Sequence, residues 1–164
     1  MIDMDKPKEF FVIAHNIRSL YNVGSIFRTS DAFGVSKIFV TGYTGTPEHP
    51  KLAKTSLGAE TTVPWEYKKS CVLLIKKLRQ DYPAIKIVGL ENNLPSKYRS
   101  KRVYLDKFKP RFPMALILGE EVSGIPANIL PHIDQFLEIP MVGQKESLNV
   151  VIAFGIAAYG LTVE

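Results

Sequence analysis

The chain has 164 residues, of which 46% are hydrophobic and 10% aromatic, and it carries a formal net charge of +5. This composition fits one globular domain with a sizeable core and excludes a disordered chain. The single cysteine excludes an internal disulfide, and the three histidines lack the spacing of metal ligands, so we expect no structural metal.

The chain begins with a short charged stretch. Residues 1–9 lack the apolar core of a signal peptide, and no later run is both long and apolar enough to indicate a membrane span. We therefore expect an N-terminal tail at 1–9, one domain at 10–164, and the cytoplasm as the default location. The basic charge favours a polyanionic partner without identifying one.

Strand and helix patterns alternate along the first half of the chain. The apolar run FFVIAH is typical of a strand buried on both faces. The patterns predict a strand, a helix and a second strand at residues 10–15, 23–33 and 35–41. Residues 42–64 are rich in Gly, Thr and Pro, and we expect a long loop with a short helix at 52–57. Long loops inside compact domains more often have a function than not.

The second half continues the alternation. Apolar residues at helical spacing predict an amphipathic helix over 65–82, and three further apolar runs predict strands at 84–90, 114–119 and 136–139. A basic connection occupies residues 91–113, and a short helix is expected at 125–134. These elements together predict a single-domain α/β fold with a mainly parallel sheet.

The last predicted helix is unusual because it has no polar face. No charge occurs between Glu146 and Glu164, and Ser147 is placed to cap a helix that starts at Leu148. An apolar helix needs cover on both sides, so we expect a sheet on one side and a partner subunit on the other, with Gly155 and Gly160 permitting close approach. The alternative is a central helix buried within one domain.

Ligands of parallel sheets bind beyond the carboxyl ends of the strands. The stretch 118–125 leaves a buried strand through Gly119, turns on Gly124 and exposes two adjacent carboxylates. Taken alone, these residues favour a simple strand-to-helix turn over a ligand site. The glycine-rich motifs of dinucleotide and nucleoside triphosphate sites are missing, which argues against both kinds of ligand.

Three motifs together carry a resemblance. They are Asn22-x-Gly24-x-x-x-Arg28, Gly119-x-Glu121-x-x-Gly124, and Ile139-Pro-Met followed by Ser147-Leu-Asn-Val150. In order and spacing they resemble the motifs of the SpoU (TrmH-type) RNA ribose methyltransferases, over about residues 10–161. The resemblance implies the SPOUT fold with a C-terminal trefoil knot, S-adenosylmethionine as methyl donor, a ribose 2′-hydroxyl of RNA as acceptor, and a homodimer.

The resemblance also implies roles for individual residues. Catalysis is expected to involve the polar motif residues Arg28, Asn22, Glu121, Ser147 and Asn149. The adenosylmethionine pocket is expected to be formed by main chain and apolar side chains near Leu90, Leu118, Gly119, Ile139, Met141 and Leu148. Phosphates of the RNA are expected to bind the basic residues Arg18, Lys97, Arg99, Lys101 and Arg102.

Arg28 is the residue to which the family gives the central role. A guanidinium keeps its proton up to about pH 12, so we expect Arg28 to clamp a phosphate and orient the hydroxyl, with action as a base left open. We expect Glu121 to orient Asn22 or Arg28. The compact chain favours tRNA over rRNA as substrate; methylation of a base nitrogen and a catalytically silent RNA-binding dimer are the alternatives.

Overall fold

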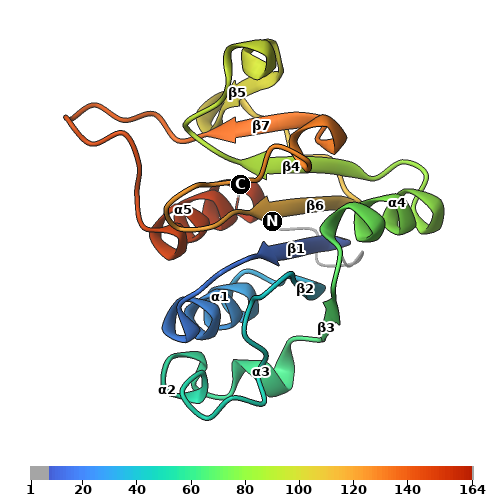
Figure 1. The fold of residues 1–164 in the computed structure, drawn as a ribbon, viewed down its shortest axis with the longest axis vertical. Helices are drawn as coiled ribbons and strands as arrows, with labels where there is room; N and C mark the ends of the chain where they lie inside the picture. Colours follow the sequence, from blue (N-terminus) through green and yellow to red (C-terminus); the bar gives the residue numbers. More distant parts are fainter. Residues whose placement is uncertain (1–7, 164) are drawn as a thin grey trace.

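The computed structural model describes residues 8–163, so most of the expected N-terminal tail lies outside the described residues. Seven parallel strands form one sheet in the order β3-β2-β1-β6-β4-β7-β5 (Figure 1). The strands are β1 Phe10–His15, β2 Lys37–Thr41, β3 Trp65–Lys68, β4 Lys86–Leu90, β5 Arg102–Tyr104, β6 Met114–Leu118 and β7 Gln135–Glu138. The predicted α/β class is confirmed.

Helices cover both faces of the sheet. The α-helices are α1 Leu20–Ala32, α2 Ala53–Ser56, α3 Ala59–Thr62, α4 Cys71–Asp81 and α5 Val150–Thr162. Three short 3₁₀ helices are η1 Ser96–Lys101, η2 Leu105–Lys107 and η3 Leu130–His132. Helices α1 and α5 cover one face and α4 the other (Figure 1).

The core follows from the apolar central strands. In β1, Val12 and Ala14 pack with α1 and α5, whereas Phe11 and Ile13 pack with α4. Successive side chains of a strand point to opposite faces, so a strand covered on both faces must be apolar at every position. The prediction of a doubly buried strand at 10–15 is therefore confirmed.

The helix predicted over 65–82 is wrong at its start. Residues Trp65–Lys68 form β3, which pairs with β2 through Ile38 and Trp65, and the helix begins at Cys71. The Ser70 hydroxyl accepts a hydrogen bond from the Leu73 amide at 3.2 Å and so caps α4. These four residues form a strand because they pair with β2, and this long-range pairing cannot be inferred from the helical spacing of apolar residues.

Two helix starts also differ from the prediction. Helix α1 begins three residues earlier, at Leu20, with Ser19 as its cap, so Asn22 is helical. Helix α5 begins at Val150, because the Asn149 side chain accepts from the Val151 amide at 2.9 Å. The cap assigned to Ser147 is therefore wrong, and residues 147 and 148 lie in the preceding loop.

Two loop regions also differ from the prediction. Residues 125–134 form turns and only a 3₁₀ turn at η3, because Pro131 lacks the amide that an α-helix would need at that position. The basic connection 91–113 contains η1, η2 and β5, and β5 pairs with β7 as the edge of the sheet. The short helix expected near 52–57 is confirmed as α2.

Helix α5 is buried on one side only. Phe154, Ala157, Ala158 and Leu161 join the core cluster that includes the sheet, which confirms the expected sheet contact. Ile152, Ile156, Tyr159 and Val163 form an exposed apolar face, of which Tyr159 is 59% exposed. Cover by a partner subunit stays a prediction, as does the trefoil knot. None of the helices within residues 8–163 has the length and hydropathy to cross a membrane.

The second face of the sheet buries the chain's single thiol. Cys71 begins α4 and lies in the core cluster of that face. Burial raises the pKa of the Cys71 thiol to about 12, so the thiol stays protonated at neutral pH and is not a nucleophile. Within residues 8–163, no group of three or more His, Cys, Asp or Glu side chains is placed to hold a metal ion.

Candidate functional site

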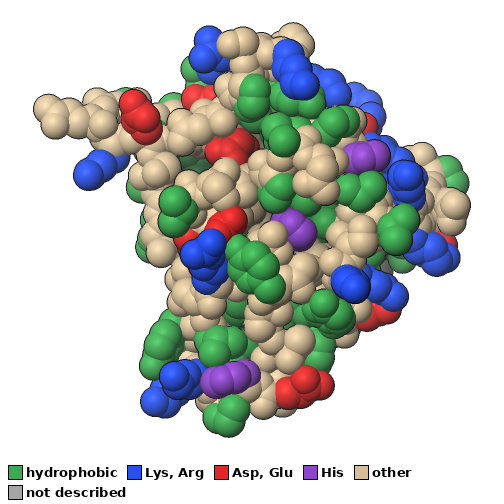
Figure 2. Space-filling view, viewed as in Figure 1, with side chains coloured by type: hydrophobic (Ala, Val, Ile, Leu, Met, Phe, Trp, Pro, Cys, Tyr) green, Lys and Arg blue, Asp and Glu red, His purple; other side chains and the backbone are tan. Residues whose placement is uncertain are grey.

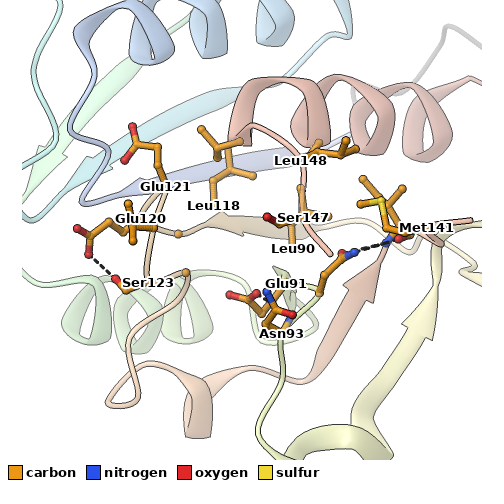
Figure 3. A pocket seen from close by; sticks show the side chains of 17 residues that line it. Leu90, Glu91, Asn93, Leu118, Glu120, Glu121, Ser123, Met141, Ser147 and Leu148 are labelled. Carbon is orange, nitrogen blue, oxygen red and sulfur yellow. Dashed lines mark hydrogen bonds between the residues drawn. The ribbon is translucent and has the colours of Figure 1, made fainter. Parts of the chain in front are cut away.

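A cavity of about 150 Å³ opens at the carboxyl ends of β4, β6 and β7. Three segments form it: the end of β4, the turn after β6, and the loop between β7 and α5. The lining residues are Leu90, Glu91, Asn92, Asn93, Leu118, Gly119, Glu120, Glu121, Val122, Ser123, Gly124, Ile139, Met141, Ser147, Leu148, Val150 and Ala153. All six residues predicted to bind the cofactor are among them, and Figure 3 shows their arrangement.

The turn after β6 is built from two glycines. Main-chain hydrogen bonds of 3.0 and 2.9 Å join Glu120 and Gly124 into a tight bridge. A Cβ atom on Gly119 would lie 2.5 Å from the Gly124 carbonyl carbon and from the Ile125 nitrogen, so only glycine fits. Gly124 has a φ of +71°, which also favours glycine. The backbone can therefore line the cavity closely.

Glu91 fastens this turn to the end of β4. Its carboxylate accepts hydrogen bonds of 3.0 Å from the Ile125 amide and from the Asn93 amide. A Cβ atom on Gly124 would meet the same carboxylate at 2.1 Å, which shows how closely the two segments approach. Sequence reasoning missed Glu91; its only signal was its position directly after a buried strand.

Asn92 fixes the third segment of the cavity. Its amide nitrogen donates to the Ile139 carbonyl at 3.0 Å, and its amide oxygen accepts from the Ile139 amide at 3.3 Å. This pair of hydrogen bonds continues the pairing of β4 and β7 beyond the last strand residues. Asn92 therefore sets the position of Met141 and of the loop that follows, and sequence reasoning missed it as well.

Glu121 connects the cavity to the start of α1. Its carboxylate accepts hydrogen bonds of 3.2 Å from the Arg18 and Ser19 amides and of 3.1 Å from the Asn22 side chain. Burial acts to raise the pKa of Glu121, but the hydrogen bonds from Asn22 and the main chain outweigh it, and the pKa lies below its ordinary value. An ionised Glu121 thus orients Asn22 across about 100 residues of sequence.

Replacement of Glu121 by glutamine tests this linkage. Because the pKa of Glu121 is lowered in the folded state, its carboxylate stabilises the fold above the ordinary pKa of about 4.3 and loses that contribution as pH falls through the lower folded-state value. We expect Glu121→Gln to lower the free energy of unfolding by about 1 kcal/mol at pH 7, after allowance for solvent screening. Urea titrations should show this difference shrink in acid; a difference independent of pH would contradict the assignment.

Glu120 points from the same turn toward a different partner. It forms an ion pair of 2.6 Å with Arg18 and accepts a hydrogen bond of 2.6 Å from the Ser123 hydroxyl. The Ser123 hydrogen bond and the nearby Arg18 charge lower the pKa of Glu120. Arg18 is 69% exposed, so this pair is solvated and contributes little to stability.

The cavity is negative in character. Glu91, Glu120 and Glu121 line it, and no Lys or Arg is found among its 17 lining residues. Leu90, Leu118 and other apolar side chains supply the remaining wall. A cavity of this kind suits a ligand that has apolar and hydrogen-bonding parts and carries a positive charge.

The comparisons with known proteins decide the family. The family model of the SpoU rRNA Methylase family matches residues 9–159. The chain belongs to this SpoU family. Residues of its second and third motifs line the cavity described above, and Asn22 of the first motif contacts Glu121.

Three relatives illustrate the likeness. The 23S rRNA (guanosine-2′-O-)-methyltransferase RlmB of Salmonella typhi is 28% identical, over 94% of this chain and 59% of that protein. The A. aeolicus TrmH/SpoU tRNA modifying enzyme is 27% identical, with a TM-score of 0.75, over 94% of this chain and 74% of that one. A structure concerning 2-OH methylation of C/U34 on tRNA covers 94% of both chains, with a TM-score of 0.78; at 23% identity it shows the fold alone. This chain spans 57% to 60% of the length of several curated relatives.

The SpoU motif residues do not all meet within one protomer. Ser147 lines the cavity and Asn22 contacts Glu121, but Asn149 is used as the cap of α5. Arg28 lies on an exposed position of α1, does not line the cavity, and makes no ion pair or side-chain hydrogen bond within residues 8–163. It is six residues from Asn22 on the same helix and therefore about 9 Å farther along its axis.

The basic residues predicted to bind RNA divide into two groups. Lys101 donates a 3.0 Å hydrogen bond to the Ile133 carbonyl, and Arg102 forms a 3.3 Å ion pair with Glu138. Lys97 is exposed and makes neither kind of contact within residues 8–163, and the exposed Arg99 lines a cavity of about 410 Å³ together with Asn92 and Arg102. In this SpoU protein, Lys97 and Arg99 are therefore available to bind a phosphate, whereas Lys101 and Arg102 already contact other residues of the protomer.

Proposed function

We propose that the chain transfers a methyl group from S-adenosylmethionine to a ribose 2′-hydroxyl of RNA. The observation that carries the proposal is the negative, glycine-built cavity at the carboxyl edge of a SpoU-family sheet. The sequences of relatives described as RNA methyltransferases align over more than 90% of this chain. The residues matched by the family model, 9–159, include all the residues that line the cavity.

The cavity residues fit adenosylmethionine. Main chain near Gly119 and Ile139 would meet its polar groups, and Leu90, Leu118 and Leu148 would cover its apolar surface. The bound donor supplies an electrophilic methyl group on a positively charged sulfonium centre. Ionised carboxylates in a partly enclosed cavity stabilise such a charge.

The chain's own residues would act mainly by positioning. Methylation replaces the hydroxyl proton with a methyl group, so the site must align the ribose oxygen and release its proton. Glu121 already accepts three hydrogen bonds, so it is better suited to hold Asn22 than to take the proton. Arg28 would clamp the phosphate next to the acceptor ribose.

Transfer RNA is the favoured substrate, with ribosomal RNA as the alternative. Relatives of both kinds align with this chain, as the A. aeolicus tRNA modifying enzyme and the S. typhi 23S rRNA methyltransferase illustrate. Transfer of labelled methyl to unfractionated tRNA and, separately, to rRNA tests the proposal. A 2′-O-methylated nucleoside after nuclease digestion supports it and selects the substrate. A methylated base would identify a different acceptor, and absence of both donor binding and transfer would leave the silent RNA-binding dimer.

The proposal includes a second copy of the chain. Arg28 does not reach the cavity of its own protomer, yet it lies on α1, which packs beside α5. The exposed apolar face of α5 is an unpartnered surface next to it. Gly155 lies within this face, where an added Cβ would meet nothing within 4 Å, whereas Gly160 already packs against Leu105. A second copy docked on α5 would cover the face and bring an Arg28 from outside the protomer.

Substitution of Ile156 by glutamate tests the dimer. A charge at this 41% exposed position should leave the fold intact but prevent two apolar faces from meeting. We expect Ile156→Glu to be monomeric at micromolar concentration and to bind adenosylmethionine at least about tenfold more weakly. Light scattering and calorimetry measure the two effects. Leu57→Glu, which adds the same charge to an exposed residue of the α2 cap, should stay dimeric; a dimeric Ile156→Glu would count against the arrangement.

A further inference from the structure

A second hollow lies at the carboxyl edge of the sheet, beside β1 and the start of α4. It is a groove of about 700 Å³, here called the lysine groove. Its eleven lining residues are His15, Lys68, Lys69, Ser70, Cys71, Val72, Leu73, Leu74, Lys77, Asn128 and Ile129. It is distinct from the cofactor cavity, with which it shares no lining residue.

The charge of the lysine groove is opposite to that of the cofactor cavity. Lys68, Lys69 and Lys77 line it, and none of its eleven lining residues is acidic. Lys69 makes no ion pair within residues 8–163, Lys68 shares the Glu66 carboxylate with a second lysine, and Lys77 pairs with Asp81 one turn farther along α4. Figure 2 shows basic side chains along this side of the molecule, over the region of α4. A polyanion is therefore attracted to the groove.

The floor of the groove is largely apolar. Val72, Leu73 and Ile129 contribute to it, and Leu73 is 66% exposed at the first turn of α4. An exposed leucine beside three lysines has no role in the core of the protomer. Apolar side chains next to groups that hold a phosphate offer a surface on which one face of a nucleobase can be removed from water.

The polar end of the groove is formed by His15. Its Nδ1 lies 2.8 Å from the Thr41 hydroxyl, and its Nε2 makes no hydrogen bond within residues 8–163. Burial lowers the pKa of His15, although the nearby Glu120 charge acts in the opposite direction. A neutral imidazole and the exposed Asn128 amide offer the hydrogen-bonding groups that read the edge of a base.

We propose that the lysine groove binds an unpaired nucleotide of the RNA substrate, with the base on its apolar floor and the phosphate on Lys68, Lys69 and Lys77. This inference rests on the proposed RNA substrate and adds a second point of attachment. The segment that follows β6 connects the two sites: its first residues line the cofactor cavity, and Asn128 and Ile129 line the groove. An RNA strand along this edge would therefore reach both, with one nucleotide held in the groove while another meets the methyl donor.

Two substitutions separate the parts of the groove. Lys69→Glu reverses the unpaired charge, and Leu73→Asp removes the most exposed apolar side chain of the groove, at the third position of α4, where an acidic residue favours the helix. Fluorescence anisotropy with labelled pentauridylate should show at least about fivefold weaker binding for each variant. Wild-type protein should also bind pentauridylate at least about fivefold more tightly than an abasic ribose-phosphate strand of equal length. Leu73→Asp should lose this preference.

Lys54→Glu is the matched control, because it makes the same charge change at an exposed position of α2. It should bind pentauridylate like the wild type, and thermal unfolding should show that all three variants fold. Unchanged binding by both groove variants, equal weakening by Lys54→Glu, or equal affinity for the abasic strand would each overturn the proposal. Pentauridylate binding is measured without a methyl donor, so the two proposals can fail separately. Methyl transfer that is unaffected by the groove variants would contradict the groove proposal alone. Groove binding without methyl transfer would contradict the methyltransferase proposal alone.

Discussion

Replacement of Arg28 by alanine is expected to lower methyl transfer by at least about 100-fold while leaving the affinity for adenosylmethionine unchanged. Arg28 is exposed on α1 and does not line the cofactor cavity, so its loss should not disturb the donor. A guanidinium binds phosphate through two parallel hydrogen bonds, which would fix the acceptor ribose in line with the methyl group. Single-turnover transfer to tRNA and calorimetric titration of the donor measure the two quantities.

Arg28→Lys separates charge from geometry. Lysine keeps the positive charge but lacks the planar guanidinium, so we expect it to restore less than about a tenth of the activity if orientation dominates. Full activity of Arg28→Ala would remove the residue from the mechanism. Weakened donor binding in that variant would instead place Arg28 in the donor site.

Gly119→Ala is expected to weaken adenosylmethionine binding by at least about tenfold. The added Cβ would lie 2.5 Å from main-chain atoms of Gly124 and Ile125, and backbone cannot move aside as the end of a flexible side chain can. Relief of such a clash shifts the turn that lines the cavity, at a cost of about 1–3 kcal/mol. Gly143→Ala is the matched control, because a Cβ at that position meets nothing within 4 Å. Calorimetry should find normal donor affinity for Gly143→Ala; normal affinity for Gly119→Ala would mean that the turn does not bind the donor.

The two variants together test whether two copies share a site. Arg28→Ala keeps an intact cavity, and Gly119→Ala keeps an intact Arg28. If Arg28 acts on the cavity of the partner, mixed dimers of the two impaired variants, assayed at a donor concentration too low to fill the Gly119→Ala cavity, contain one complete site and regain up to about half of the activity per dimer. If Arg28 acts within its own protomer, every site in the mixture lacks one component and activity stays low.

The strands were predictable because their signal is local. The runs at 10–15, 84–90 and 114–119 are almost wholly apolar, with His15 and Lys86 at the ends of β1 and β4, as a strand with both faces covered requires, and β1, β4 and β6 are the three central strands. Trp65–Lys68 was not predictable in this way. It forms an edge strand of four residues, whose pairing with β2 depends on a neighbour 27 residues earlier, and its pattern merges with that of α4.

The motifs predicted many of the residues that line the cavity, but not the hydrogen bonds that join its segments. The glycines and apolar residues of the second and third motifs line one cavity, whereas no residue of the Asn22–Arg28 motif does. Glu91 and Asn92 belong to none of the motifs, and their importance comes from main-chain partners 34 and 47 residues away. Such contacts depend on which strands become neighbours in the sheet.

The sequence by itself determined the family and the α/β class, and its motifs predicted residues that line the cavity beyond β4, β6 and β7, because motif order and hydrophobic period are properties of consecutive residues. The tertiary structure alone decided that Glu121 holds Asn22, that Arg28 lies away from the cavity of its own protomer, and that a negative cavity and a basic groove share one edge. The physical reason is that parallel strands bring their carboxyl ends together in an order unrelated to their order in the chain. Charges that are far apart in the sequence thereby become neighbours.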